Sequence, residues 1–235
     1  MTPPPFRTFE AGHLITLAAI AGAAVLVSAA ARAGTLGRRR WIGAMIAAVL
    51  VGYAALFYVE QGIERSLSWE YSLPLELCNL VLVACIVSLL WPNRLSTEIA
   101  YFWGFGGVVQ ALLTPDITQG FPSWQYFMFF LSHGATLVAI AFLVSDRQLR
   151  IGAGSLLRMM AALNGYALAV GAADALFGWN YGYLCRKPGM PSLLDYLGPW
   201  PYYLVSLEAV ALAVFVILYL PWRLSGPHSP MRGKR

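Results

Sequence analysis

The chain has 235 residues, of which 59% are hydrophobic and only 11% are charged, and its net charge is +5. This composition lies outside the range of soluble domains and indicates a polytopic membrane protein. The excess of cations does not point to nucleic acid, because the basic residues cluster at the ends of apolar segments, where they face anionic lipid.

Seven segments approach the roughly 20 apolar residues that a helix needs to cross a bilayer. The sequence therefore predicts an all-α bundle of seven transmembrane helices, forming one domain over residues 1–235. The predicted spans lie near 13–31, 41–59, 74–91, 98–113, 124–144, 155–178 and 199–221. The fourth span is short, and its glycines Gly104, Gly106 and Gly107 predict close packing or a kink.

The basic residues are distributed unevenly between the two sides of these spans. One side holds Arg32, Arg38, Arg39, Arg40, Arg94, Arg147, Arg150, Arg158, Arg223, Arg232, Lys234 and Arg235. The other side holds Arg7, Arg65, Arg186 and Lys187. Since cationic loops stay in the cytoplasm, this bias predicts an outside N-terminus and a cytoplasmic C-terminus, in the cytoplasmic (inner) membrane.

Some stretches of sequence recur in the two halves of the chain. HLITLAAIA, from His13, and HGATLVAIA, from His133, share six of nine residues. MIAAVLVGYA, ending at Ala54, resembles MMAALNGYA, ending at Ala167. These pairs predict a parallel repeat of three helices on each side of a linking fourth helix, a plan that sugar carriers of the SWEET type also use. Coincidence between alanine-rich helices is the alternative interpretation.

Polar side chains inside apolar spans are costly, so each of them is a candidate site residue. The set comprises His13, Glu76, Cys78, Asn79, His133, Asn164, Asp174 and Glu208. Most of these side chains are predicted in the outer half of the bundle. The inner half is predicted to be nearly all apolar between its arginines.

Each candidate also has a structural interpretation. Glu76 could cap its helix, because a carboxylate in a first turn satisfies free N–H groups. Cys78 lies near a helix N-terminus, which favours a thiolate, but it could be a small apolar residue or form a disulfide with Cys185. His133 could serve as a hydrogen-bonding residue between helices. The cysteines show no metal-binding spacing, so neither a metal nor a cofactor is expected.

Four motifs resemble a known family. They are FRTFEAGHLITL (6–17), LPLELCNL (73–80), LSHGATL (131–137) and NYGYLCRKPGMPSLLDYLGPWPYYL (180–204). They resemble a bacterial integral membrane family typified by YwaF, which is similar to vertebrate transmembrane protein 164. The resemblance spans nearly the whole chain, and the last motif is specific because it is long and rich in Trp, Tyr, Pro and Gly.

The resemblance implies a phospholipid acyltransferase that uses a cysteine and a histidine within the membrane. By motif position these two residues are Cys78 and His133. Members of the family often carry histidine where this chain has Glu76. Membrane lipids would then be the substrates.

Acyl transfer needs a nucleophile, a base and donors for the oxyanion. Asn79 or Asn164 could supply the donors. Arg186 and Lys187, in the same outer loop as Asn180, could hold a lipid phosphate. The residues of the pair are predicted at different depths, about 6 Å for the cysteine and about 13 Å for the histidine, so the shallower His13 is an alternative base.

A small-solute carrier is the competing function. Glu208, Asn164 and His133 would form its polar site near the midplane. The apolar inner half, the thiol and the outer-loop motif argue against a carrier, because a carrier needs a route to both faces and no thiol. A purely structural or sensory membrane protein is a third interpretation.

Overall fold

The computed structural model describes residues 3–145, 149 and 151–224, whose regular elements are helical apart from an isolated bridge between Pro5 and Gln119. Five helices are long and apolar enough to cross a membrane: α1 (Ala11–Ala33), α2 (Leu36–Glu64), α6 (Trp124–Ser145), α7 (Ala153–Phe177) and α8 (Tyr202–Leu224). The shorter helices are α3 (Leu77–Leu90), α4 (Arg94–Trp103), the π-helix η1 (Gly104–Val108) and α5 (Val109–Leu113). Short 3-10 helices follow α7 at η2 (Tyr181–Tyr183) and η3 (Leu193–Leu197).

The elements α4, η1 and α5 follow one another without a break and form the fourth predicted span. At Gly104 an added Cβ would overlap Cδ1 of Ile140 and lie 3.2 Å from Val81 Cγ1. The backbone of this span therefore lies directly against α6 and α3, which confirms the close packing predicted for its glycines. Each of the seven predicted spans thus corresponds to a helical segment, and the all-α, multi-pass class is confirmed among the described residues.

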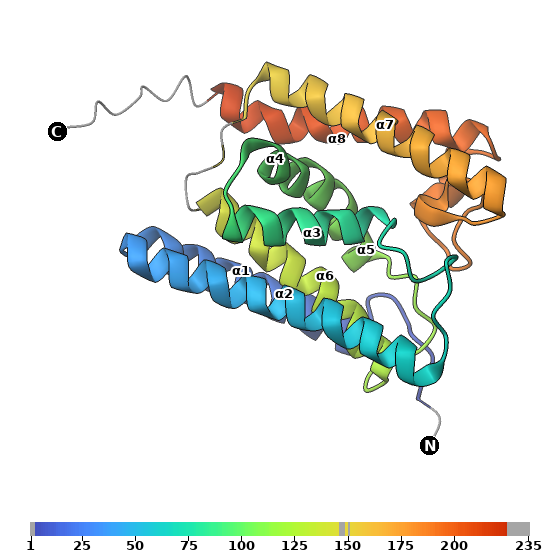
Figure 1. The fold of residues 1–235 in the computed structure, drawn as a ribbon, viewed down its shortest axis with the longest axis horizontal. Helices are drawn as coiled ribbons and strands as arrows, with labels where there is room; N and C mark the ends of the chain where they lie inside the picture. Colours follow the sequence, from blue (N-terminus) through green and yellow to red (C-terminus); the bar gives the residue numbers. More distant parts are fainter. Residues whose placement is uncertain (1–2, 146–148, 150, 225–235) are drawn as a thin grey trace.

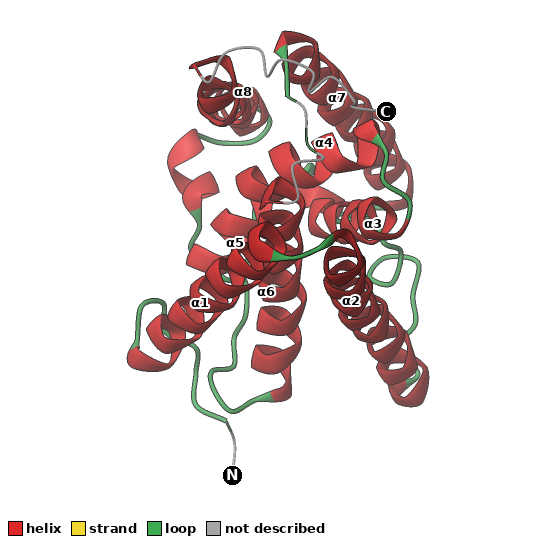
Figure 2. Cartoon of the chain, turned by 90° about the vertical axis from the view of Figure 1, so that its left-hand side faces the viewer, coloured by secondary structure: helices red, strands yellow, loops and turns green. Residues whose placement is uncertain are grey.

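The bundle is built around α6, which packs against α1, α2 and α3. Figure 1 shows α1 and α2 on one side of the molecule, α7 and α8 on the other, and α3 to α5 between them. Figure 2 shows the same separation from another direction. Half of the most apolar stretch of α6 is buried, whereas at most 17% is buried in the other four long helices. The outer helices therefore present leucine, isoleucine and valine to the surrounding lipid.

Seven of the described arginines lie at one end of the bundle, which we call the arginine-rich end, whereas Arg7, Arg65 and Arg186 lie at the other. The seven comprise Arg32, Arg38, Arg39, Arg40, Arg94, Arg158 and Arg223. The opposite, loop-rich end carries the connections 65–76, 114–123 and 178–201. The other cations assigned to the first side, Arg147, Arg150, Arg232, Lys234 and Arg235, lie outside the described residues. The cytoplasmic orientation of this end and the internal repeat stay predictions.

The interior of the arginine-rich half is not apolar, so that prediction is wrong. Glu98 is fully buried and accepts hydrogen bonds from Arg94 Nε at 2.8 Å, Arg158 Nη2 at 2.7 Å and Ser155 Oγ at 2.7 Å. The sequence interpretation placed Glu98 at the first residue of its span. The helix instead begins at Arg94, one turn earlier, and this turn carries the carboxylate into the bundle.

Candidate functional site

The site begins with the short helix α3, which starts at Leu77, three residues later than predicted. With 14 residues it is about 21 Å long, less than the roughly 30 Å of a bilayer core. The loop 65–76 completes the crossing, and the Tyr166 hydroxyl of α7 donates to Leu75 O at 2.8 Å. Figure 1 shows α3 beginning well short of the ends of α2 and α7. The first turn of α3 therefore lies inside the bundle.

Cys78 lies in this first turn, and its thiol is half-buried. The side chains of Tyr53 on α2 and Tyr166 on α7 lie near this thiol. Each tyrosine lies about 16 Å along its helix from the loop-rich end, and His133 lies about 13 Å along α6. Cys78 and His133 therefore occupy similar depths. The depth difference expected from the sequence does not arise, because α3 starts within the bundle.

A chain of polar contacts leads from the thiol toward the imidazole. The Tyr53 hydroxyl, which neighbours Cys78, also lies close to the side chain of Ser132 on α6. Ser132 Oγ lies 2.9 Å from His133 Nδ1. Residues of α2, α3 and α6 thus converge on one region, and the helices α3 and α6 are in direct contact.

The ring of His133 is held in a defined orientation. Its Nδ1 lies 2.9 Å from the backbone carbonyl of Phe129, and the ring stacks on that phenyl group with centroids 4.1 Å apart. A carbonyl oxygen can only accept, so Nδ1 carries the proton in this contact. The lone pair of the neutral ring is then on Nε2, the nitrogen that can act as a base.

His13 has no such lone pair. Its Nδ1 accepts from Phe9 N–H at 2.9 Å, so its Nε2 carries the proton and donates to Leu112 O at 2.8 Å. The ring is buried, with the phenyl rings of Phe6 and Phe130 5.3 and 5.5 Å away. These contacts join the N-terminal segment to α1, α5 and α6, so the imidazole serves the fold.

Two acids of the site accept successive N–H groups from the outer loop. Asp174 Oδ1 accepts from Tyr181 N at 3.1 Å, and Glu76 Oε2 accepts from Gly182 N at 3.0 Å. Glu76 occupies the N-cap position of α3 but makes no side-chain cap hydrogen bond, so its capping interpretation is wrong. Together the two carboxylates hold this loop beside the first turn of α3. We call these two hydrogen bonds the carboxylate latch.

Asn180 organises the outer loop that follows. Its Oδ1 accepts from the N–H groups of Cys185 at 3.0 Å and Arg186 at 2.7 Å, and its Nδ2 donates to Arg186 O at 3.1 Å. The ammonium of Lys187 lies 5.6 Å from the centre of the Tyr203 ring. Cys185 is a free thiol, as are the other two cysteines, so the disulfide interpretation of Cys78 is not realised.

Four side chains near the site were not singled out from the sequence: Tyr53, Asp116, Tyr166 and Tyr183. Tyr183 donates to Asp116 at 2.7 Å; burial and this carboxylate raise the pKa of Tyr183, so its hydroxyl stays protonated. A signal for two of them was present. Tyr53 and Tyr166 are the tyrosines of the matched GYA stretches, and both lie beside Cys78.

Asn164 and Glu208 form a separate pair between α7 and α8. Asn164 Nδ2 donates to Glu208 Oε1 at 2.6 Å and to Met160 O at 3.0 Å. Among the described residues, their hydrogen bonds do not lead to Cys78. Asn79, by contrast, follows Cys78 directly and is half-buried.

Comparison with protein families identifies the class to which this fold and site belong. A model of the TMEM164 family matches residues 8–219. The chain belongs to the TMEM164 family. The match covers the first six predicted spans and all but the end of the seventh, together with Cys78 and His133, whereas the narrower YwaF-like grouping stays a prediction. Comparisons with curated proteins and with solved structures give no match.

Proposed function

We propose that this member of the TMEM164 family is a lipid acyltransferase, with Cys78 as nucleophile and His133 as base. One observation carries the proposal. The short α3 sets the thiol at the depth of an imidazole whose Nδ1 is held by Phe129, which leaves Nε2 as the basic nitrogen. Membrane lipids are the proposed substrates, and the cytoplasmic membrane is the proposed location.

In the first step His133 Nε2 takes the proton of the Cys78 thiol while the sulfur attacks an ester carbonyl of the donor phospholipid. The C–O bond of the ester breaks, and the imidazolium returns the proton to the departing alkoxide, which leaves as a lysolipid. The base is needed because the Glu76 carboxylate lies only two residues before Cys78. A nearby carboxylate disfavours the thiolate form of Cys78, so the thiol has to lose its proton as the sulfur attacks the ester.

In the second step the hydroxyl of an acceptor lysolipid gives its proton to Nε2 and attacks the thioester. The C–S bond breaks, and the thiol regains its proton from the imidazolium. Each tetrahedral intermediate carries an oxyanion that needs donors. The N–H groups of Leu77 and Cys78 precede the first intrahelical bonds of α3, and the Asn79 amide is adjacent, so this turn supplies them.

Two cations at the loop-rich end are proposed to bind the phosphate of the lipid substrate. Arg186 is exposed, and Lys187 follows it in the outer loop ordered by Asn180. A guanidinium and an ammonium at this position suit a phospholipid phosphate.

The SWEET-like carrier stays the second candidate, because the Asn164–Glu208 pair lies within the span of two helices. The argument from an apolar inner half no longer holds, since Glu98 is buried there. A different feature supports the enzyme. The middle of the bundle is filled by buried apolar side chains, among them Val81, Phe102 and Ile140, which separate the polar groups at its two ends.

The decisive experiment gives purified protein a phospholipid donor with a labelled acyl chain and a lysolipid acceptor. Wild-type protein should form a thioester that hydroxylamine releases, and Cys78→Ala should form none. His133→Ala should slow formation and turnover of the adduct by about 10²- to 10⁴-fold, the usual contribution of a general base. The matched controls are Cys185→Ala, at another half-buried thiol, and Glu208→Gln, in the carrier's site. Both should react at the wild-type rate.

Acyl transfer by Cys78→Ala at the wild-type rate would remove the thiol from the mechanism. Absence of an acyl adduct on the wild-type protein, with solute uptake that Glu208→Gln abolishes and Cys78→Ala does not, would favour the carrier. Circular dichroism and size-exclusion profiles of each variant distinguish a lost reaction from a lost fold.

A further inference from the structure

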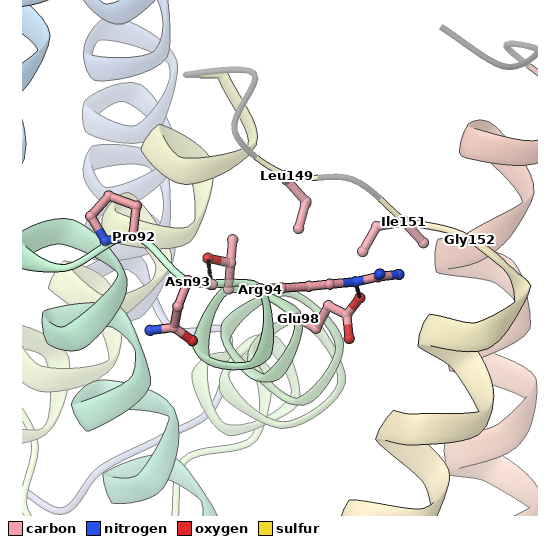
Figure 3. A pocket seen from close by; sticks show the side chains of 8 residues that line it. Pro92, Asn93, Arg94, Glu98, Leu149, Ile151 and Gly152 are labelled. Carbon is pink, nitrogen blue, oxygen red and sulfur yellow. Dashed lines mark hydrogen bonds and ion pairs between the residues drawn. The ribbon is translucent and has the colours of Figure 1, made fainter. Parts of the chain in front are cut away.

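A cavity of about 510 Å³ lies at the arginine-rich end, far from the thiol site. It lies between the start of α4 and the residues Leu149, Ile151 and Gly152 (Figure 3). Its wall includes Asn93, Arg94, Thr97, Glu98, Ile151 and Gly152. A cavity of this volume is comparable with those that hold small ligands or lipid headgroups.

Two guanidinium groups meet on one carboxylate at this cavity. Oε1 of Glu98 accepts from Arg94 Nε at 2.8 Å and from Arg158 Nη2 at 2.7 Å, and Oε2 accepts from Arg158 Nε at 3.1 Å. Because both arginines contact the same oxygen, their positive charges lie side by side. One carboxylate cannot neutralise both, so the cluster retains a net charge of about +1.

The acid and the two arginines of this cluster differ in how far they are exposed. The Glu98 side chain is 1% exposed, whereas the side chains of Arg94 and Arg158 are 62% and 42% exposed. The acid is thus buried in the protein, and the cations lie between it and the solvent. Arg94 uses only Nε toward Glu98, so the N–H groups of its two terminal nitrogens are not engaged by this carboxylate. In Figure 3 the Arg94 side chain extends along the cavity toward Ile151 and Gly152.

We infer that this cavity binds a phosphate ester, either the headgroup of an anionic lipid or a soluble phosphate ester. Phosphate oxygens match the planar donors of arginine, and a carboxylate that holds two guanidiniums in place lowers the entropy lost on binding. The apolar side chains of Leu149 and Ile151 beside the cations suit the glycerol portion of a lipid. Basic pockets between transmembrane helices are known to favour anionic headgroups. The inference is independent of acyl transfer at Cys78.

The test measures ligand-induced stabilisation of the full chain in a zwitterionic detergent. Dioctanoyl phosphatidic acid should raise the unfolding temperature in a saturable way, and dioctanoyl phosphatidylcholine should not. Arg94→Gln should weaken binding of phosphatidic acid about tenfold, because it removes charge-assisted hydrogen bonds. Glu98 still keeps its contacts with Arg158 and Ser155 in this variant, so the fold is preserved. The matched control is Arg223→Gln, which removes an exposed arginine at the same end of the bundle and should bind as the wild type does.

A second variant tests the cavity and leaves both arginines in place. An added Cβ at Gly152 would meet no atom within 4 Å, so Gly152→Trp can place its side chain in the cavity. Binding should be lost while the unfolding temperature without ligand stays unchanged. Equal stabilisation by phosphatidic acid and phosphatidylcholine, or unchanged binding in both Arg94→Gln and Gly152→Trp, would overturn the inference. Glycerol phosphate distinguishes the two sources. If it displaces phosphatidic acid at similar concentration, the cavity binds a soluble ester. If it does not displace phosphatidic acid, the cavity binds a lipid.

Discussion

Replacing Gly182 by alanine should disturb the site through a steric contact with the Tyr166 hydroxyl. Gly182 has a φ of +63°, and its N–H is held by Glu76 in the carboxylate latch. A Cβ at this position would lie 2.6 Å from the hydroxyl oxygen of Tyr166. That hydroxyl donates to Leu75 O, so the substitution pushes on the residue that positions the start of α3.

The expected loss of unfolding free energy in Gly182→Ala has two parts. A side chain at positive φ costs about 1 kcal/mol relative to glycine. Displacing the Tyr166 hydroxyl from Leu75 O loses a neutral hydrogen bond worth about 1 kcal/mol. Gly182→Ala should therefore lower the free energy of unfolding by about 2 kcal/mol. Movement of α3 should also slow formation of the Cys78 thioester.

The assay is unfolding by sodium dodecyl sulfate in mixed micelles, run beside the acylation rate. Gly178→Ala is the matched control, because its φ is +76° and no atom lies within 4 Å of its added Cβ. Its free energy of unfolding should fall only by the part due to the positive φ, about 1 kcal/mol. The double variant Gly182→Ala with Tyr166→Phe tests the contact directly. Without the hydroxyl oxygen the nearest ring atom is 3.4 Å from the Cβ, and the hydrogen bond to Leu75 O is already absent. The double variant should therefore lose no more stability than Gly182→Ala alone.

Equal losses in Gly182→Ala and Gly178→Ala would refute this reasoning, because the Tyr166 contact would then contribute nothing. Additive effects in the double variant would lead to the same conclusion.

The other predictions concern packing, charge and topology. Gly104→Ala should destabilise the bundle by about 1–3 kcal/mol in the same assay, because its Cβ would overlap Ile140, whereas Gly106→Ala, with 3.7 Å to its nearest neighbour, should be nearly neutral. Glu98→Gln should cost about 2 kcal/mol in unfolding measurements at low salt, and less at high salt, because two guanidiniums lose their shared anion. A reporter enzyme fused after Arg235 should be active only in the cytoplasm, and outside activity would reverse the predicted orientation.

The seven spans could be predicted because a helix in lipid has to be long and apolar, a requirement that local composition records. The residue at which α3 starts could not be predicted in this way. Pro74 is typical of a first helical turn, but the backbone at Leu75 is held outside the helix by Tyr166, a residue distant in sequence. The missed burial of Glu98 had a local signal: Asn93 accepts from Ser96 N at 2.9 Å as an N-cap, and it directly precedes Arg94.

The candidate site was only partly predictable. Cys78 and His133 stand out because thiols and imidazoles are unusual within apolar spans, and the family motif falls on both. Tyr53 and Tyr166 were missed since tyrosine in a membrane helix usually marks the interface with water. The role of Glu76 was missed because its partner, the N–H of Gly182, belongs to a loop whose path local sequence does not specify.

The short third helix has a consequence for the surrounding bilayer. On its open side, where Val83 is 45% exposed, α3 offers lipid about 21 Å of apolar length, while its neighbours offer considerably more. Lipid accommodates such a mismatch by thinning locally, which lowers headgroups and ester linkages toward the midplane. The ester bonds of adjacent lipids would thereby approach the level of Cys78. Membranes made of shorter acyl chains should need less deformation to reach the thiol, so bilayer thickness itself would set the rate of the proposed acyl transfer.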